Sequence, residues 1–417
     1  MRNQLVFCIL IVLISSSGCK KSMSLKPDLK ETLQGIINKN LAEYKAKFPD
    51  EAIGLGLYVK EAGKATHLKS TQDIYVSSGF PESYGADVHF RGASTTKSFT
   101  AAAILQLSQQ NKLNLDDLIT ANIPGKNQPY IPASSEFAIP NKNEITIRLL
   151  LQHRAGVFDI TNDPLPDTVK APYVKGKYVD YIMTTQGVNH TFTIPELVSV
   201  VAKNKLSYFK PGKAFHYSNT GFHLLAIIIE RVSGKRYDQF LQDEFLTPLQ
   251  MNKTRFPYLG TDNNMPRPYV TGWLKFRDTT GQVKFAEWDE DNVSFTVADG
   301  NIITTPADLA TWANALYATN TILNAKVHAQ MITGIPTKEE HVIYGLGTEM
   351  NPPDIGYGHN GARPAYMTIM RYNPETRASY ILVANFLDAT SNAALNAQGD
   401  GLSEIVREAV QAVKASQ

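Results

Sequence analysis

The stretch GASTTKSFTAAAILQL, residues 92–107, decides how this sequence is interpreted. Its apolar residues, which include Phe99 and Leu107, predict a buried helix. Ser94 and Lys97 stand at the start of that helix, and a spacing of three places their side chains on one face. A serine hydroxyl is a poor nucleophile at neutral pH and needs an adjacent base, which a lysine with a lowered pKa can be. The backbone N–H groups at a helix N-terminus also suit a developing oxyanion, so the stretch indicates a nucleophilic serine.

The Ser-x-x-Lys pattern alone is weak evidence for an enzyme. It also occurs at Ser17–Lys20 and at Ser207–Lys210, and an isolated match is typically a solvated pair on a helix surface. A lysine near the start of a buried helix, however, usually has a partner. The pattern therefore asks for supporting motifs elsewhere in the chain.

Three further segments supply that support. Tyr217-Ser218-Asn219 is the only Tyr-x-Asn triplet among the 19 tyrosines, and it stands before a predicted buried helix at Phe222. His359-Asn360-Gly361 stands just before a predicted hairpin, and residues 149–156 read LLLQHRAG. In this order the motifs resemble the family of class C serine β-lactamases, D-alanyl-D-alanine carboxypeptidases and related esterases and D-aminopeptidases. The resemblance covers roughly residues 30–415.

The resemblance implies a catalytic role for three side chains. Ser94 would attack a carbonyl carbon and form an acyl-enzyme. Lys97 and Tyr217 would share the proton transfers, with the phenol a candidate base for acylation or for the deacylating water. Because lysine and tyrosine normally titrate near pH 10, burial and neighbouring charges would have to tune either one to serve as a base.

The resemblance also implies substrate-binding roles. Asn219 would hydrogen-bond Lys97 and the substrate amide, and His359 would support Tyr217 through a hydrogen bond. The backbone N–H groups of Ser94 and Ala362 would form an oxyanion hole. Gly361 would let the edge strand approach closely.

Two departures from the family pattern bear on the substrate. His359 stands where lactamases of this family usually carry Lys, and Ala362 stands where carboxypeptidases often carry a hydroxyl residue that grips the substrate carboxylate. Arg363 is an alternative source of positive charge. The stretch 159–190 is polar and rich in Tyr and Pro, and is a candidate insertion over the cleft.

Other conspicuous residues have simpler interpretations. His153 is expected to be a buried structural histidine that bonds a neighbouring loop. Asp299 is expected to shape a turn beside the cleft together with Gly300. The three tryptophans are expected to pack, with pocket lining as the alternative: Trp273, Trp288 and Trp312.

The periodicity predicts a mixed α/β (α+β) fold, and the resemblance implies that this fold is like that of β-lactamases and transpeptidases. An antiparallel sheet would be assembled from both ends of the chain and flanked by terminal helices, with a mainly helical domain inserted. The expected bounds are 28–93 and 295–415 for the α/β part and 94–294 for the helical part, together forming one domain over 28–415.

The N-terminus predicts export. Residues 5–14 form an apolar run of ten residues, too short to span a bilayer but suited to a signal peptide over 1–18. Cys19 follows small residues, as in a bacterial lipobox, so it is predicted to be lipidated, with 19–27 as a linker. Ordinary cleavage near Ser17 or Gly18 is the alternative. The expected location is therefore the periplasm or the outer membrane through an N-terminal lipid only, or else a secreted soluble form.

Composition narrows the classes of partner. The 417 residues carry 41 basic and 39 acidic side chains, a formal charge of +2, which argues against nucleic acid. The nine histidines are scattered, so neither a metal nor an organic cofactor is predicted. The expected partner is a small-molecule or peptide substrate, and the default oligomeric state is a monomer.

The sequence thus predicts an exported serine hydrolase, most simply a DD-peptidase-like enzyme that acts on D-amino-acid peptides, plausibly from the cell wall. A β-lactamase or esterase of the same family is the close alternative. A catalytically idle penicillin-recognising or wall-binding protein is the alternative from another class.

Overall fold

The computed structural model describes residues 28–48, 52–62, 73–81, 83–278, 280–337, 343–350 and 353–417. The predicted signal peptide and Cys19 lie outside these residues. None of the helices in this part of the chain is long and apolar enough to cross a membrane.

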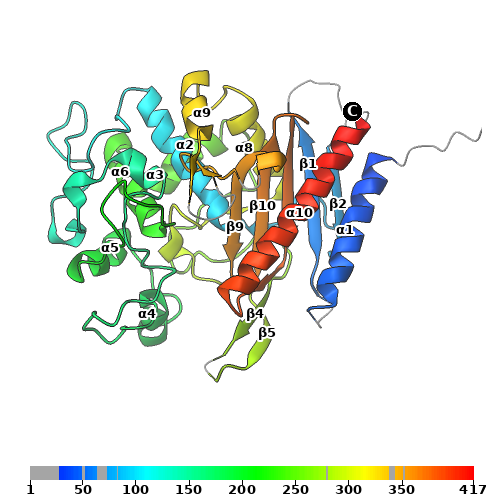
Figure 1. Cartoon of the computed structure of the whole chain (residues 1–417), viewed down its shortest axis with the longest axis horizontal. Helices are drawn as coiled ribbons and strands as arrows, with labels where there is room; N and C mark the ends of the chain where they lie inside the picture. Colours follow the sequence, from blue (N-terminus) through cyan, green and yellow to red (C-terminus); the bar gives the residue numbers. More distant parts are fainter. Residues whose placement is uncertain are drawn as a thin grey trace, which may run out of the picture.

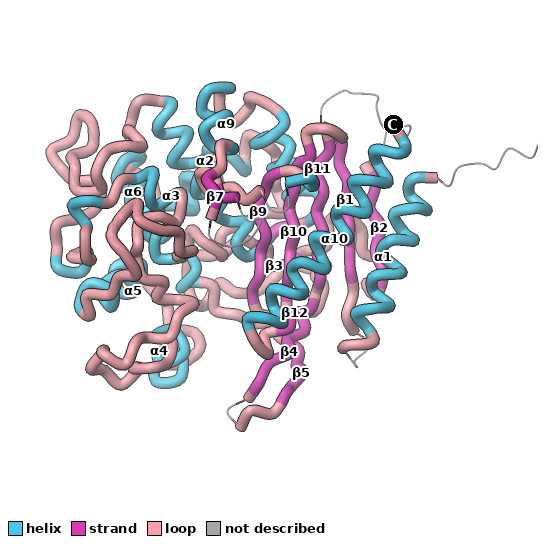
Figure 2. Tube along the Cα trace, viewed as in Figure 1, coloured by secondary structure: helices cyan, strands magenta, loops and turns pink. Residues whose placement is uncertain are grey.

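A five-stranded antiparallel sheet joins the two ends of the chain, in the order β2-β1-β11-β10-β9 (Figure 2). Leu55 of β1 pairs with Ala384 of β11, so the N-terminal hairpin is completed by C-terminal strands. The prediction of an antiparallel sheet assembled from both ends of the chain is confirmed. The strand bounds are Leu55–Glu61 (β1), Ile74–Ser78 (β2), Tyr357–Arg363 (β9), Tyr366–Asn373 (β10) and Ala378–Ala384 (β11).

The terminal helices α1 (Leu29–Lys45) and α10 (Asn392–Ser416) lie side by side over one face of this sheet (Figure 1). Each buries one stripe, formed in α1 by Leu33, Ile37 and Leu41. Such a stripe is what an amphipathic helix presents to a core. This layer also confirms the predicted terminal helices.

The opposite face of the sheet packs against α8 (Pro306–Ala313) and the helical part of the molecule. Within it α2 and α6 pack together and are buried along most of their length. The helices of this part are α2 (Thr96–Gln109), α3 (Ile147–Leu151), α4 (Tyr178–Gln186), α5 (Ile194–Lys203), α6 (Asn219–Ser233), α7 (Tyr237–Leu241) and α9 (Ala325–Ile332).

Small sheets complete the fold. A hairpin of β4 and β5 lies within the stretch predicted to be mainly helical, and β4 pairs in parallel with β12 near the C-terminus. The remaining short strands pair as β3 with β6 and β7 with β8. The bounds are Phe90–Arg91 (β3), Trp273–Arg277 (β4), Val283–Glu287 (β5), Ile303–Thr304 (β6), Ile335–Pro336 (β7), Ile343–Tyr344 (β8) and Phe386–Asp388 (β12).

Two helix positions differ from the prediction in ways that affect the site. Helix α6 begins at Asn219 and not at Phe222, because the Ser218 side chain caps it by accepting from the Gly221 N–H. Helix α4 lies in the stretch for which the sequence suggested only an insertion. Trp312 packs as expected: it is buried and its ring stacks on Phe99 at 3.8 Å between centroids.

Candidate active site

The predicted nucleophile lies in a tight turn that leads into α2. Ala93, just before Ser94, has φ of 49°, a left-handed conformation that costs a residue with a Cβ about 1–2 kcal/mol. The edge strand β9 packs closely on this turn, because a Cβ on Gly361 would lie 2.2 Å from the carbonyl oxygen of Gly92. Gly361 therefore allows β9 to approach the turn, and Ser94 stands at the wall of a pocket of about 220 Å³.

Lys97 reaches Ser94 from one helical turn further along α2. Its ammonium donates to Ser94 Oγ at 3.2 Å, to Asn219 Oδ1 at 2.8 Å and to the main-chain oxygen of Asp299 at 2.9 Å. An ammonium has three N–H donors, so all are used. The hydrogen bond predicted between Lys97 and Asn219 is present.

The environment of Lys97 brings the pKa of its ammonium group close to neutral pH. The side chain is 0% exposed, and burial lowers the pKa of Lys97 to about 8 against the opposing charges of Asp299, Asp159 and Glu349. Burial disfavours the charged ammonium. Lys97 is therefore the group at Ser94 that can accept a proton near neutral pH.

Tyr217 completes this group. Its ring centroid is 4.6 Å from Lys97 Nζ, and its hydroxyl is close enough to Ser94 for the two side chains to interact. Burial, with the charge of Glu349, raises the pKa of Tyr217 well above its usual value, although the interaction with Ser94 opposes this shift. The phenol therefore keeps its proton at neutral pH. It is placed as a proton donor more readily than as the base that the resemblance suggested.

Asn219 is fixed by contacts on both sides of its amide. Its Nδ2 donates to Thr161 Oγ1 at 2.8 Å, while Oδ1 accepts from Lys97. Its backbone N–H donates to Asp159 Oδ2 at 3.1 Å. Ser218 is the residue that caps α6, so Asn219 orients Lys97 and does not serve as the cap.

In the motif His359-Asn360-Gly361, one contact differs from the expectation. His359 Nε2 is hydrogen-bonded to the hydroxyl of Tyr344 at 3.0 Å, and that hydroxyl also contacts His153 Nε2 at 3.2 Å. The expected bond from His359 to Tyr217 is replaced by a ring contact with centroids 6.3 Å apart. The Ser218 N–H donates to His153 Nδ1 at 3.1 Å, which confirms His153 as a structural residue that bonds a neighbouring loop.

Arg363 does not face the pocket as a free cation. Its Nε lies 2.5 Å from Asp291 Oδ2, and its terminal nitrogen donates to the main-chain oxygen of Asn292 at 2.8 Å. Its guanidinium also lies over the Phe295 ring, 4.9 Å from the centroid. The adjacent Ala362 is exposed at the pocket wall and offers no side-chain donor. Arg363 is therefore neutralised by Asp291.

The opposite wall of the pocket comes from the stretch predicted to cover the cleft. The lining residues that belong to or adjoin α4 are Lys177, Val179, Asp180 and Met183. The stretch does form a wall of the pocket.

Asp299 has contacts that the sequence did not indicate. Its carboxylate Oδ1 accepts from His223 Nε2 at 2.9 Å, and Oδ2 lies 3.8 Å from Lys97 Nζ. Thus Asp299 does more than shape a turn. Neither His223 nor Tyr344 was identified from the sequence. A usable signal was present for His223, which stands four residues after Asn219 and so on the same face of α6.

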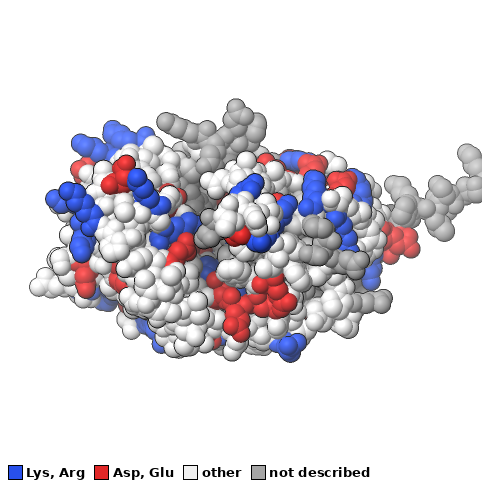
Figure 3. Space-filling model, turned by 90° about the horizontal axis from the view of Figure 1, so that it is seen from below, with Lys and Arg blue, Asp and Glu red and all other residues white. Residues whose placement is uncertain are grey.

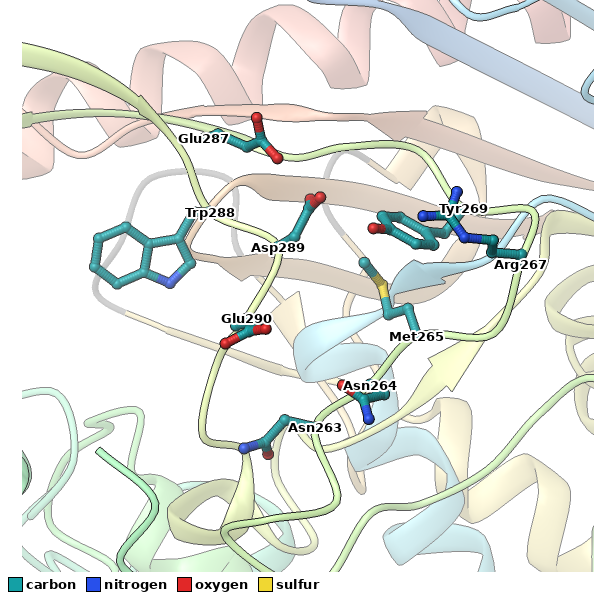
Figure 4. A pocket seen from close by; sticks show the side chains of 9 residues that line it. All are labelled: Asn263, Asn264, Met265, Arg267, Tyr269, Glu287, Trp288, Asp289 and Glu290. Atoms are coloured by element: carbon teal, nitrogen blue, oxygen red, sulfur yellow. The ribbon is translucent and has the colours of Figure 1, made fainter. Parts of the chain in front are cut away.

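A wider pocket of about 780 Å³ adjoins the candidate active site and shares Trp288 with it (Figure 4). Its charged lining comprises three carboxylates, Glu287, Asp289 and Glu290, and one guanidinium, Arg267. Acidic side chains also gather near the middle of the molecular face seen from below (Figure 3). The pocket that adjoins the candidate active site therefore has a mainly acidic charged lining.

No group of three or more metal-ligating side chains occurs among the residues that the structure describes. The chemistry of the site is that of a serine with an adjacent lysine and tyrosine.

Comparison with known proteins gives a family match and several relatives. Residues 50–402 match the β-lactamase family model. The chain is 27% identical over 304 residues to penicillin-binding protein 4* of Bacillus subtilis, covering 71% of this chain and 60% of the relative. It is 32% identical over 166 residues to the protein flp of Staphylococcus aureus, covering 39% of this chain and 27% of that protein. The chain thus spans less than two thirds of the length of these relatives.

Solved structures agree in fold. A D-amino acid amidase from Ochrobactrum anthropi, complexed with D-phenylalanine, superposes with a TM-score of 0.70 at 24% identity, covering 94% of this chain and 100% of that one. A D-stereospecific amidohydrolase from Streptomyces gives a TM-score of 0.67 at 24% identity, with coverages of 86% and 95%.

Proposed function

Since this chain is a serine hydrolase of the β-lactamase family, we propose that it acts through an acyl-enzyme on Ser94 and hydrolyses peptides and amides of D-amino acids. Within this class, we propose that it prefers substrates that carry no carboxylate beside the bond that is cut. The observation that carries this preference is the pairing of Arg363 with Asp291 next to Ala362.

The contacts around Ser94 support a two-step mechanism. Neutral Lys97 accepts the Ser94 proton as Oγ attacks the carbonyl carbon, and the backbone N–H groups of Ser94 and Ala362 stabilise the oxyanion. The C–N bond then breaks, and Tyr217 donates its phenolic proton to the leaving amine and is reprotonated from Lys97. Water attacks the acyl-enzyme in the second step with the same groups, releasing the acid and restoring Ser94.

The charge distribution supports a preference for neutral or cationic substrates. A substrate carboxylate at the edge of β9 would find neither a hydroxyl from Ala362 nor a free charge on Arg363. The acidic lining of the adjoining pocket would repel it further and attract an ammonium group. The proteins of the same fold include an amidase and an amidohydrolase, which agrees with an amide substrate.

One observation favours the alternative of a carboxypeptidase or β-lactamase. Lys177, the residue before α4, lines the same pocket from the opposite wall and forms no ion pair within the described part of the chain. A substrate carboxylate that reached this wall would be attracted to its ammonium. Lys177→Ala separates the two proposals, because only the alternative predicts a loss of activity confined to carboxylate-bearing substrates.

The test is a comparison of kcat/KM for four substrates: D-phenylalanine amide, an acylated D-Ala-D-Ala peptide, a penicillin and a short-chain aryl ester. We expect the amide and the ester to exceed the peptide and the penicillin by about tenfold, the ratio that corresponds to about 1.5 kcal/mol for a missing charge-assisted hydrogen bond. Penicillin turnover equal to that of the best substrate would contradict the proposed preference.

We also propose an exported monomer anchored by a lipid on Cys19. The support is the apolar leader followed by small residues and a cysteine. A diacylated N-terminus binds membranes through two or more chains, so Cys19→Ser should move the protein from the membrane fraction to the soluble fraction. Unchanged membrane association of this variant would point to another means of attachment.

A further inference from the structure

We propose that His223 and Asp299 form a buried positioning pair that holds Lys97 against Ser94 and, through the Asp299 charge, controls when Lys97 can accept the Ser94 proton. This inference rests on the proposed role of Lys97 as the proton acceptor. It adds two residues to the reaction, neither of which touches the reacting atoms.

The geometry links three separate elements. Asp299, in the loop before α8, contacts Lys97 through its main-chain oxygen at 2.9 Å and its carboxylate at 3.8 Å. His223 holds the other carboxylate oxygen at 2.9 Å. His223 stands one helical turn after Asn219, which itself accepts from Lys97 at 2.8 Å. One face of α6 therefore positions Lys97 twice, directly through Asn219 and indirectly through Asp299.

The burial of His223 indicates that a polar side chain at this position has a specific role. His223 is 0% exposed and Asp299 is 2% exposed. The neighbouring residues Phe222, Leu224 and Leu225 are apolar and equally buried, so an apolar side chain would suit this position. A buried polar group is costly without a hydrogen bond. Asp299 is the hydrogen-bond partner of His223, and the other ring nitrogen, Nδ1, has none within the described residues.

Among the charged groups around Lys97, Asp299 is the main charge partner. Asp159 is already held by the Asn219 N–H and by Thr161 and Asn162. Glu349 contributes a weaker attraction than either aspartate, while burial of Lys97 acts in the opposite direction. The titratable rings that face Lys97 belong to Tyr217, His153 and His359.

The sign of the effect follows from these charges. Asp299 raises the pKa of Lys97 against the lowering effect of burial, which together give about 8. Asp299→Asn removes the charge and keeps the side-chain size, so the pKa of Lys97 should fall further. Because the neutral amine accepts the proton, acylation in this variant should begin at lower pH than in the wild type.

The experiment measures the pH dependence of acylation by p-nitrophenyl acetate, from p-nitrophenol release and the mass of the protein. For Asp299→Asn we expect the midpoint of the rising limb to move down by about one to three pH units, the range for an opposite charge within about 4–6 Å. His223→Phe should lower the acylation rate about tenfold, with little change in KM, because Lys97 is held less firmly. His223→Gln keeps an N–H donor near the position of Nε2 and should restore much of that rate.

The control is Trp312→Phe, which removes a buried hydrogen bond to Ser98 Oγ in which Lys97 takes no part. It should lower thermal stability and leave the midpoint unchanged. An unshifted midpoint in folded Asp299→Asn, or equal rates for His223→Phe and His223→Gln, would overturn the inference. If Asp299→Asn does not fold, the two His223 variants decide. Failure of the wild-type protein to become acylated at all would instead overturn the proposed function.

Discussion

Helices α1 and α10 on one side of the main sheet contrast with α2 and α6 on the other. All three buried residues of α1 are apolar, and its remaining residues are at least partly exposed. By contrast α2 and α6 are buried almost throughout, and their first turns bury Lys97, Asn219 and His223. Helix α1 therefore stabilises the sheet through apolar contacts, whereas the inner pair also holds polar groups in place for chemistry. The difference teaches that the polar residues buried at the starts of α2 and α6 mark the site.

The strongest test of this contrast is Ser94→Ala on α2. Removing the hydroxyl should lower turnover by at least about a thousandfold, because no nucleophile remains for the acyl-enzyme. Thermal unfolding should be nearly unchanged, since Ser94 is only half-buried and stands at a pocket wall. Turnover at the wild-type rate would refute the mechanism, and an idle protein would show none in either form.

The opposite result is expected on α1. Leu33 is fully buried, so Leu33→Ala should lower the free energy of unfolding by about 2–5 kcal/mol through lost apolar contacts and a cavity. The kcat/KM per folded molecule should stay close to the wild-type value. Urea unfolding measures the free energy of unfolding, and rates normalised by active-site titration give kcat/KM per folded molecule. A specific loss of kcat/KM would show that the two helix pairs do not have separate roles.

The buried ammonium group of Lys97 on α2 predicts that kcat/KM depends on pH. Because burial lowers the pKa of Lys97 to about 8, the ammonium form dominates below pH 8 and the base form above it. The kcat/KM for a neutral ester should rise about tenfold from pH 7 to its alkaline plateau. A rate that is flat over pH 6–9 would exclude Lys97 as the acceptor.

The smallest effect is expected at the edge strand beside α2. Ala362→Ser adds a hydroxyl at the exposed pocket wall. It should raise kcat/KM for the D-Ala-D-Ala peptide by up to about tenfold, and raise it less for a neutral ester, since a hydrogen bond to a charged group contributes about 1.5 kcal/mol. Equal gains for both substrates would indicate a change in the strand and not in carboxylate binding.

The sheet and its terminal helices could be predicted because their patterns are local. The stripe of Leu33, Ile37 and Leu41 has helical spacing, and the strand-like runs at 366–372 and 378–385 flank a recognisable turn. Helix α4 was missed because its apolar residues fall within only nine positions of a longer stretch that is otherwise polar and rich in Pro. The start of α6 was predicted at Phe222, three residues too late, because Ser218 forms the cap.

The motif residues could be located from the sequence, but several of their partners could not. Tyr344 reaches His359 from a short strand, and Asp291 neutralises Arg363 from a loop. His223 and Asp299 are brought together from positions 76 residues apart. Such pairs depend on how elements that are distant in the sequence pack together, and residue spacing within one segment does not predict that packing.

The central claim is that Ser94 carries the acyl group, and mass spectrometry of the trapped intermediate tests it most directly. Wild-type protein would be exposed in parallel to a penicillin, a D-Ala-D-Ala peptide and an aryl ester, quenched in acid and digested. We expect an added acyl mass on the peptide that contains Ser94, most abundant with the ester and absent from Ser94→Ala. An adduct on any other residue, or full turnover with no adduct detectable at early times on Ser94, would contradict the account.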